Sequence, residues 1–448
     1  MKSPTKVLAI VASVAMVASL AACSANGGSS SGKTELRVAT FPPGADAAAY
    51  EAFAAQEKQF EKLNPDIDII GVEYEWEGPT FAVQLAAGSL PDVFTVPFTD
   101  SQTLLQNGQL ADVTKEIADL GYTDKFNPII LDAVKDSDGK LYGFPRQAYA
   151  LGLQYNRQLF EAAGLDPNSP PTTWEQVREY AKAIADKTGK AGFATMTQNN
   201  TGGWQLTAQS AARGGFMQTD GKSTINNDGV KKTLQFFHDL RWEDNSMGSN
   251  FLLDWGTINQ EFAAGNIGMY TSGSDLYTAL TRDFSLDPAV YGLTTIPMDG
   301  PDAKVLGGGD IAVLPSSIDD TTKAAAVKWI DWYYMQKLLN KDAAQLDAKT
   351  LADSGQAVGT PVLPVLDQAT YEESQTWIEP YVNIPRDQMS GFFDGIFSQT
   401  PVAEPTLHTQ EIYALLDSVV QKVLTDQNAD IDALLTQADK DAQALIDG

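Results

Sequence analysis

The sequence is poor in the residues that form disulfides and metal sites. It contains one cysteine, Cys23, and two histidines, His238 and His408, among 448 residues. A single cysteine excludes an internal disulfide framework. The two histidines lie far apart, and neither has a second histidine at ligand spacing, so we expect no metal centre and no cofactor. The 58 acidic residues always allow a pair of carboxylates, so a glycosidase remains an alternative.

Basic residues are also scarce, with 31 lysines and arginines against 58 acids and a net charge of −27. Such a surface repels nucleic acid and anionic lipid, and it argues against phosphate-rich partners. The sequence has neither a GxxxxGK[ST] nor a GxGxxG motif, which gives no support to a nucleotide-binding loop. It has no GxSxG motif either, so a serine nucleophile elbow is not expected. We therefore expect a binding protein rather than an enzyme.

Apolar runs long enough to span a membrane are missing. Residues 7–18 form a run that is too short for a spanning helix, which needs roughly 20 residues. The run follows two lysines and is typical of a secretory signal, here residues 1–22. The quartet Leu20–Cys23 resembles a bacterial lipoprotein box, which implies lipidation of Cys23 and an anchor in the cell membrane. The alternative is an ordinary cleavage site with an incidental cysteine.

Residues 23–33 form a Gly/Ser-rich linker with a root-mean-square span of roughly 17 Å. The body that follows is too long for one core, so two domains are expected. Its first part alternates between strand and helix patterns, with strands at 35–40, 66–76 and 91–96 and helices at 46–62 and 81–88. This alternation predicts an α/β fold with a mainly parallel sheet, in which ligands lie at the carboxyl ends of strands.

Eight short segments, in order, carry a resemblance to a known family: FEKLNPDIDI, LAAGSLPDVF, NGQLADVT, GKLYGFP, LQYNRQLFEAAGL, PPTTWEQVREYAKAI, FAAGNIGMYTSGS and GGGDIAVLPSS. Together they resemble the extracellular solute-binding proteins of ABC importers, sugar-binding family 1, in the branch of maltose-binding protein. The resemblance implies a two-lobed periplasmic-binding-protein-like fold of type II with several hinge crossings.

The resemblance also implies where the two lobes begin and end in the sequence. Lobe 1 would comprise residues 34–145 and 309–350, and lobe 2 would comprise residues 146–308 and 351–448. The chain would cross between lobes near 145–149, 306–310 and 351–360. The triple glycine 307–309 suits a hinge or a close backbone approach to ligand.

The implied function is a monomeric substrate-binding lipoprotein that captures an oligosaccharide or other sugar and delivers it to ABC permease transmembrane subunits. Three alternatives remain at this point: a receptor for a polyol, sugar acid or other small polar solute, a secreted glycoside-acting enzyme, and an adhesin or structural lipoprotein.

Sugars are bound by aromatic faces and by polar groups that meet ring hydroxyls. By resemblance, Trp204 and Phe393 match sugar-stacking positions. Asp275 stands where the branch often has an aromatic residue, and Tyr149 stands where it has an acid. The remaining candidates lie in loops or after expected strands: Phe41, Asp46, Trp76, Phe98, Asp100, Trp255, Gly309, Asp310, Arg386 and Asp394.

Other tryptophans are expected to pack rather than bind. Trp174 follows Thr173, a predicted helix cap with Gln176 at the reciprocal position, so it belongs to a first helical turn. Trp329 and Trp332 lie in a helical stripe and are predicted to be in the core.

Overall fold

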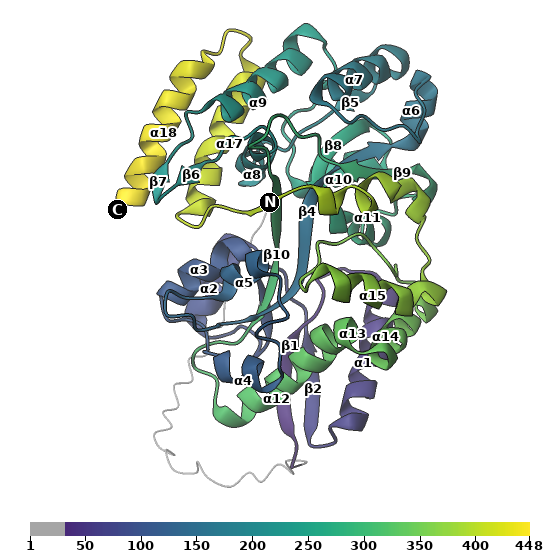
Figure 1. Ribbon diagram of the computed structural model, residues 1–448, viewed down its shortest axis with the longest axis vertical. Helices are drawn as coiled ribbons and strands as arrows, with labels where there is room; N and C mark the ends of the chain where they lie inside the picture. The colour runs from purple at the N-terminus through teal and green to yellow at the C-terminus, as the bar shows by residue number, and fades with distance from the viewer. Residues whose placement is uncertain (1–31) are drawn as a thin grey trace, which may run out of the picture.

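The computed structural model describes residues 32–448 as two lobes at opposite ends of a pair of long strands (Figure 1). The expected signal peptide, Cys23 and the linker up to residue 31 lie outside the described residues. Among residues 32–448, no helix combines the length and apolarity that a membrane span requires.

The first lobe confirms the predicted alternation of strands and helices. Strands β1 and β2 pair in parallel, and a parallel bridge from Val38 to Val93 brings the chain before β3 alongside β1. Helix α1 begins at the cap Asp46, whose carboxylate accepts from the Ala49 amide at 2.7 Å. The elements of this lobe are β1 (Thr34–Ala39), α1 (Ala47–Leu63), β2 (Ile67–Val72), α2 (Gly78–Ala87), β3 (Phe94–Pro97), α3 (Phe98–Gln106), α4 (Thr114–Asp119), α5 (Pro128–Leu131), η1 (Asp132–Val134), α12 (Asp320–Ile330), η5 (Asp331–Met335), α13 (Gln336–Leu339), α14 (Lys341–Asp353), α15 (Gln368–Ile378) and η6 (Glu379–Tyr381).

The second lobe is richer in helix, and its strands extend the central sheet. Thr173 caps α7 as predicted, with its hydroxyl accepting from the Gln176 amide at 3.2 Å. The Gln176 side chain accepts from the amide of Thr172, one residue before the expected cap. The elements are α6 (Arg157–Ala163), α7 (Trp174–Thr188), β5 (Ala191–Phe193), α8 (Thr201–Ala211), β6 (Gln218–Thr219), β7 (Lys222–Ser223), α9 (Asp228–His238), η2 (Asp239–Glu243), α10 (Trp255–Ala263), β8 (Ile267–Gly273), η3 (Ser274–Leu276), α11 (Tyr277–Arg282), η4 (Pro288–Val290), β9 (Tyr291–Thr295), η7 (Arg386–Met389), α16 (Ser390–Phe393), η8 (Ile396–Ser398), α17 (Thr409–Thr425) and α18 (Ile431–Asp447).

Two antiparallel strands, β4 (Phe144–Asn156) and β10 (Val305–Val313), join the lobes. At one end β10 pairs with β3, and at the other β4 pairs with β8 and β9 while β10 pairs with β11 (Pro401–Ala403). The order β11-β10-β4-β8-β5 therefore runs through both lobes. Parallel pairing joins β1 to β2, β10 to β11 and β5 to β8. Strand β4 pairs antiparallel with β8, β9 and β10, so the long sheet is mixed and not mainly parallel as expected.

The glycines of β10 permit the close approach of these two strands. A Cβ at Gly308 would lie 2.3 Å from the Tyr149 hydroxyl, and one at Gly309 would lie 2.2 Å from the Gln147 carbonyl. Both distances are far below contact, so any larger residue would push β10 off β4. The glycine run therefore serves the packing of the two joining strands.

The last crossing between the lobes does not lie at residues 351–360, where it was expected. The chain remains on the first lobe at Leu363, whose amide donates to the Ala148 carbonyl at 3.0 Å, and at Val365, whose carbonyl accepts from Asn127 at 3.0 Å. Helix α15 then packs beside α14 and α13. The chain reaches the second lobe after η6, where α16 packs on β9. Main-chain bonds of residues 363–366, invisible in the sequence, hold this segment.

The first-lobe core is built around Trp329, which is 1% exposed. Its ring stacks on Tyr333 at 4.7 Å and meets the edge of Phe60 at 5.1 Å. Trp332 is partly buried and packs on the same group, with ring centroids 5.8 Å from Trp329. In the other lobe Trp174 is buried beneath the guanidinium of Arg213, 3.7 Å from its ring. These tryptophans are packing residues, as predicted.

Candidate functional site

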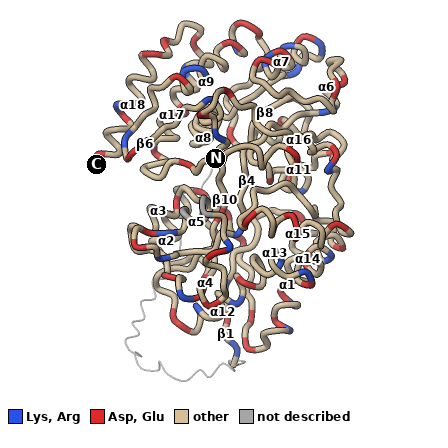
Figure 2. Tube along the Cα trace, viewed as in Figure 1, with Lys and Arg blue, Asp and Glu red and all other residues tan. Residues whose placement is uncertain are grey.

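A cleft of about 2180 Å³ separates the lobes and exposes residues from both. Its walls hold thirteen aromatic side chains, ten acids and only three basic residues among the described positions. Acidic residues are also spread along the chain in both lobes (Figure 2). A concave cavity that combines aromatic side chains with fixed polar groups is the usual form of a small-molecule site. The cleft is therefore the candidate ligand site.

The structure brings most of the predicted site residues to this cleft. Those that line it are Phe41, Asp46, Trp76, Phe98, Asp100, Tyr149, Trp204, Trp255, Asp275, Gly309 and Asp310. Phe98 and Asp100 follow the carboxyl end of β3, as expected, but they form the first turn of α3 rather than a loop. Trp204 lies in the first turn of α8.

Three predicted residues, Arg386, Phe393 and Asp394, are not among the residues that line the cleft. The Arg386 guanidinium donates to the Gln375 side chain at 2.7 Å and lies 5.3 Å from the ring of Phe393. The neighbouring Phe392 is fully buried. Because α16 packs on β9, Phe393 lies partly buried beside the core and under Arg386. Asp394 is exposed at the end of α16.

On the first-lobe wall, Trp76 is held by a carboxylate. Its indole nitrogen donates to Asp100 at 3.0 Å, and its ring lies 6.5 Å from Phe81. Burial raises the pKa of Asp100, while the Trp76 hydrogen bond lowers it and Glu411 of the second lobe raises it further. The hydrogen bond fixes the plane of the indole, which prepares an aromatic face at the cleft.

On the second-lobe wall, Trp255 is the most open of the candidate aromatics, at 38% exposure. Its ring meets Phe284 edge-on at 5.9 Å, and both residues line the cleft. Arg282 lies between the lobes: it is paired with Asp283 at 2.7 Å and sits 5.5 Å from the ring of Phe41 in the first lobe. Phe284 and Arg282 escaped the sequence analysis because they lie at the end of a short helix without a distinctive pattern.

The floor of the cleft is a polar network on the joining strands. Arg146 of β4 pairs with Asp310 of β10 at 2.8 Å, and the Gln147 amide donates to Asp275. Burial raises the pKa of Asp275 to about 6, and the nearby charge of Asp310 acts in the same direction. Arg146 and Gln147 were not predicted, although they lie within the predicted crossing at "FPRQAYA".

A second group on the floor combines Tyr149, Trp204 and Glu404. The rings of Tyr149 and Trp204 meet edge-to-face at 6.2 Å, and the Tyr149 hydroxyl donates to Glu404 at 3.4 Å. Burial raises the pKa of Glu404 to about 7, although the hydrogen bond from Tyr149 lowers it. Sequence reasoning missed Glu404, which lies in an irregular segment between β11 and α17 and is brought to the hinge only by the fold.

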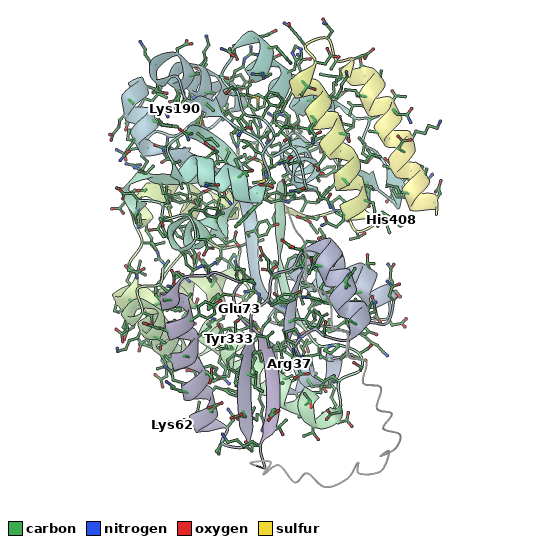
Figure 3. The ribbon with its side chains drawn as sticks, turned by 180° about the vertical axis from the view of Figure 1, so that it is seen from behind. Arg37, Lys62, Glu73, Lys190, Tyr333 and His408 are labelled. Atoms are coloured by element: carbon green, nitrogen blue, oxygen red, sulfur yellow. The ribbon has the colours of Figure 1, made fainter. Side chains whose placement is uncertain are left out.

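The histidines lie away from this floor. His408 is exposed at the start of α17 on the second lobe, whereas Tyr333 belongs to the first lobe (Figure 3). His238 is bonded through Nε2 to the Gln427 carbonyl at 2.9 Å. Within residues 32–448, no group of three His, Cys, Asp or Glu side chains is placed to hold a metal ion.

Two lobes, three crossings and an aromatic cleft define a two-lobed binding protein of the periplasmic type. The family model for bacterial extracellular solute-binding proteins matches residues 55–350, and the chain belongs to this family. The resemblance read from the eight segments is thereby confirmed.

A curated relative is the sn-glycerol-3-phosphate-binding periplasmic protein UgpB of Salmonella typhimurium, which is 22% identical over 293 residues. The match covers 61% of this chain and spans about 65% of the length of that relative.

Two solved structures share the fold over almost the whole chain. The ABC substrate-binding protein Lmo0181 of Listeria monocytogenes, in complex with cycloalternan, has a TM-score of 0.71 at 21% identity and covers 93% of this chain and 99% of that one. The cyclic alpha-maltosyl-1,6-maltose binding protein of Arthrobacter globiformis has a TM-score of 0.70 at 24% identity and covers 93% and 100%. These likenesses confirm the two-lobed α/β fold.

Proposed function

We propose that the protein captures a neutral oligosaccharide between its two lobes and delivers it to the membrane permease of an ABC importer. The observation that carries this proposal is the cleft, to which both lobes contribute candidate aromatic faces: Trp76 from the first lobe and Trp204 and Trp255 from the second. Its volume of about 2180 Å³ exceeds the roughly 300–1,000 Å³ of ordinary small-molecule sites, which favours several sugar rings over a single polyol.

The charges of the cleft argue against an anionic ligand such as a sugar acid or sn-glycerol 3-phosphate. The three basic residues that line it are already paired: Arg146 with Asp310 at 2.8 Å, Arg282 with Asp283 at 2.7 Å and Lys337 with Asp347 at 3.6 Å. Ten acids would repel an added negative charge. A neutral sugar avoids this cost and can use the carboxylates as acceptors for its hydroxyls.

Isothermal titration calorimetry against a panel tests the proposal. We expect saturable binding of a linear or cyclic maltooligosaccharide and no binding of sn-glycerol 3-phosphate. Chromatography after prolonged incubation should return the sugar intact, since the protein is proposed to be a receptor and not an enzyme. Tight binding of sn-glycerol 3-phosphate without any sugar would overturn the ligand class, and cleavage of the sugar would favour the enzyme.

The proposal places the protein outside the cytoplasm as a monomer, anchored through lipid on Cys23. Mass spectrometry of the membrane-extracted mature chain should find an acylated Cys23 at its start, and Cys23→Ser should remove the anchor. A single acyl chain binds membranes only marginally, so two or more chains are expected. A mature wild-type chain without lipid, recovered entirely from the medium, would contradict the anchor.

A further inference from the structure

One side chain on the cleft wall connects the two lobes directly. The Gln410 amide nitrogen, in the first turn of α17, donates to the hydroxyl of Thr99 at 3.1 Å. Thr99 belongs to the first turn of α3 in the other lobe and is only 8% exposed. Both residues line the cleft, and Gln410 was not among the candidates read from the sequence.

The side-chain oxygen of Gln410 also has a hydrogen-bond partner. The Gln410 oxygen accepts from the side chain of Asn200 at 3.1 Å. Asn200 precedes α8 with φ of 67°, a conformation that non-glycine residues seldom adopt. The main-chain amides of Asn200 and Gly203 donate to the buried carboxylate of Asp417 at 2.7 and 2.8 Å. The start of α8 is thus fixed from α17 by two side chains.

We propose that Gln410 is a positioning residue for ligand capture, which couples closure of the lobes to the placement of the start of α8 and of Trp204. This inference rests on the proposed function of the cleft. The amide donates to the first lobe and accepts from the second. When the lobes separate, the bond to Thr99 breaks, and the side chain loses one of its two anchors. Asn200 then loses part of the restraint that keeps its strained conformation.

Like charges next to this contact weaken it, so without ligand it holds only part of the molecules closed. Asp100 and Glu411 directly follow Thr99 and Gln410, so the hydrogen bond brings two carboxylates of opposite lobes toward each other. Burial raises the pKa of Asp100, and Glu411 adds to the effect. The gain from one hydrogen bond is therefore partly offset, so the contact raises the closed fraction of the unliganded protein and ligand contacts to both lobes complete the closure.

Three variants separate this role from ordinary packing. Thr99→Val removes only the bond between lobes, and Gln410→Ala removes both bonds. Gln421→Ala is the matched control, because Gln421 lies on the same helix and its side chain donates to the Thr197 carbonyl within the second lobe at 2.7 Å. Small-angle scattering without ligand should give a larger radius of gyration for Thr99→Val and Gln410→Ala than for the wild type and the control.

The second readout is dissociation of a bound maltooligosaccharide by stopped flow. Loss of one hydrogen bond should speed dissociation by about threefold to tenfold for Thr99→Val and Gln410→Ala, and the double variant should add nothing beyond Gln410→Ala. Scattering curves that match the wild type for both variants, or an equal change in Gln421→Ala, would overturn the inference. The scattering needs no sugar, so it decides the matter even if none of the sugars binds and the proposed ligand class fails.

Discussion

Two groups of aromatic residues, one in the first-lobe core and one along the cleft, use the same side chains for opposite purposes. In the core, Trp329 is 1% exposed and packs against Tyr333, Phe60 and Phe53 without a polar partner for its faces. In the cleft, Trp255 is 38% exposed and meets a single neighbouring ring, Phe284. An aromatic residue enclosed on all sides supports folding, whereas one with a free face retains surface for a ligand.

The polar surroundings separate the two groups as clearly as exposure does. The indole of Trp76 donates to Asp100, and Tyr149, which packs on Trp204, donates to Glu404. Carboxylates beside aromatic faces cost desolvation and contribute little to a core. Their placement is understandable if the same groups bind hydroxyls of a sugar, and the following experiments test this contrast.

The largest effect is expected for Trp329→Ala. Removing a fully buried indole leaves a cavity among Phe60, Phe53 and Tyr333 and should lower the free energy of unfolding by about 3–5 kcal/mol. Urea denaturation measures this loss, and calorimetry with an oligosaccharide at low temperature should find the affinity of the folded fraction within about twofold of the wild type. A variant as stable as the wild type would remove the distinction between the core and cleft groups.

The second effect concerns Trp204→Ala and Trp255→Ala. Loss of one aromatic face from a sugar site should weaken binding by about 1–3 kcal/mol, or roughly tenfold to a hundredfold in Kd. Each side chain is only partly buried, so we expect thermal unfolding to shift by no more than a few degrees. Calorimetry and thermal melts on the same preparations give both numbers. Unchanged affinity together with a large fall in melting temperature would assign the residue to packing instead.

The third effect is a pH dependence that arises at the hinge. Burial raises the pKa of Glu404 from 4.5 to about 7, so between these values the folded protein binds more protons than the unfolded chain. Stability from this group is therefore present at low pH and is lost as pH rises through about 7. From about pH 8 to about pH 5 the wild type should gain on the order of 1–3 kcal/mol relative to Glu404→Gln.

Asp275, with its pKa raised to about 6 by burial, acts in the same direction and remains in the variant. The informative quantity is accordingly the difference between the two urea-denaturation profiles and not the slope of either one. Parallel profiles across this range would mean that Glu404 is ionised and solvated in the folded protein. Lys231→Ala, which removes an exposed ion pair with Asp432, is a suitable control. Its urea-denaturation profile should run parallel to that of the wild type across this pH range.

The sequence predicted those features that depend on neighbours along the chain. The strand–helix alternation of residues 34–97 and the cap Thr173 follow from local patterns, and the structure confirms them. Strands β4 and β10 lie at the positions where family resemblance put the first two crossings. Contacts between segments that lie far apart in the sequence were not predicted. Glu404, Gln410 and Arg282 gain their partners from residues more than a hundred positions away or from the other lobe. No periodicity marks such residues.

The same limit explains the two differences in the last quarter of the chain. The segment at 363–366 is held on the first lobe by main-chain bonds, which do not depend on side-chain identity and leave no trace in the sequence. Phe392 and Phe393 are adjacent and alike, so the sequence gives no basis for deciding which one faces the core and which one approaches a ligand. The structure buries Phe392 fully and places Phe393 beneath Arg386.

The smallest effect is therefore expected for Phe393→Ala, which tests whether an aromatic residue outside the cleft is dispensable for binding. Resemblance made Phe393 a stacking residue, but its ring lies 5.3 Å from the Arg386 guanidinium and does not line the cleft. Truncation should leave the affinity for an oligosaccharide within about twofold and reduce stability by about 1 kcal/mol, because a partly buried ring and one cation–π contact are lost. Calorimetry beside Trp204→Ala on the same sugar makes the comparison direct. If Phe393→Ala instead lost tenfold or more in affinity with stability intact, the α16 segment would have to move into the cleft when ligand binds, and Phe393 would rejoin Trp204 among the ligand-binding residues.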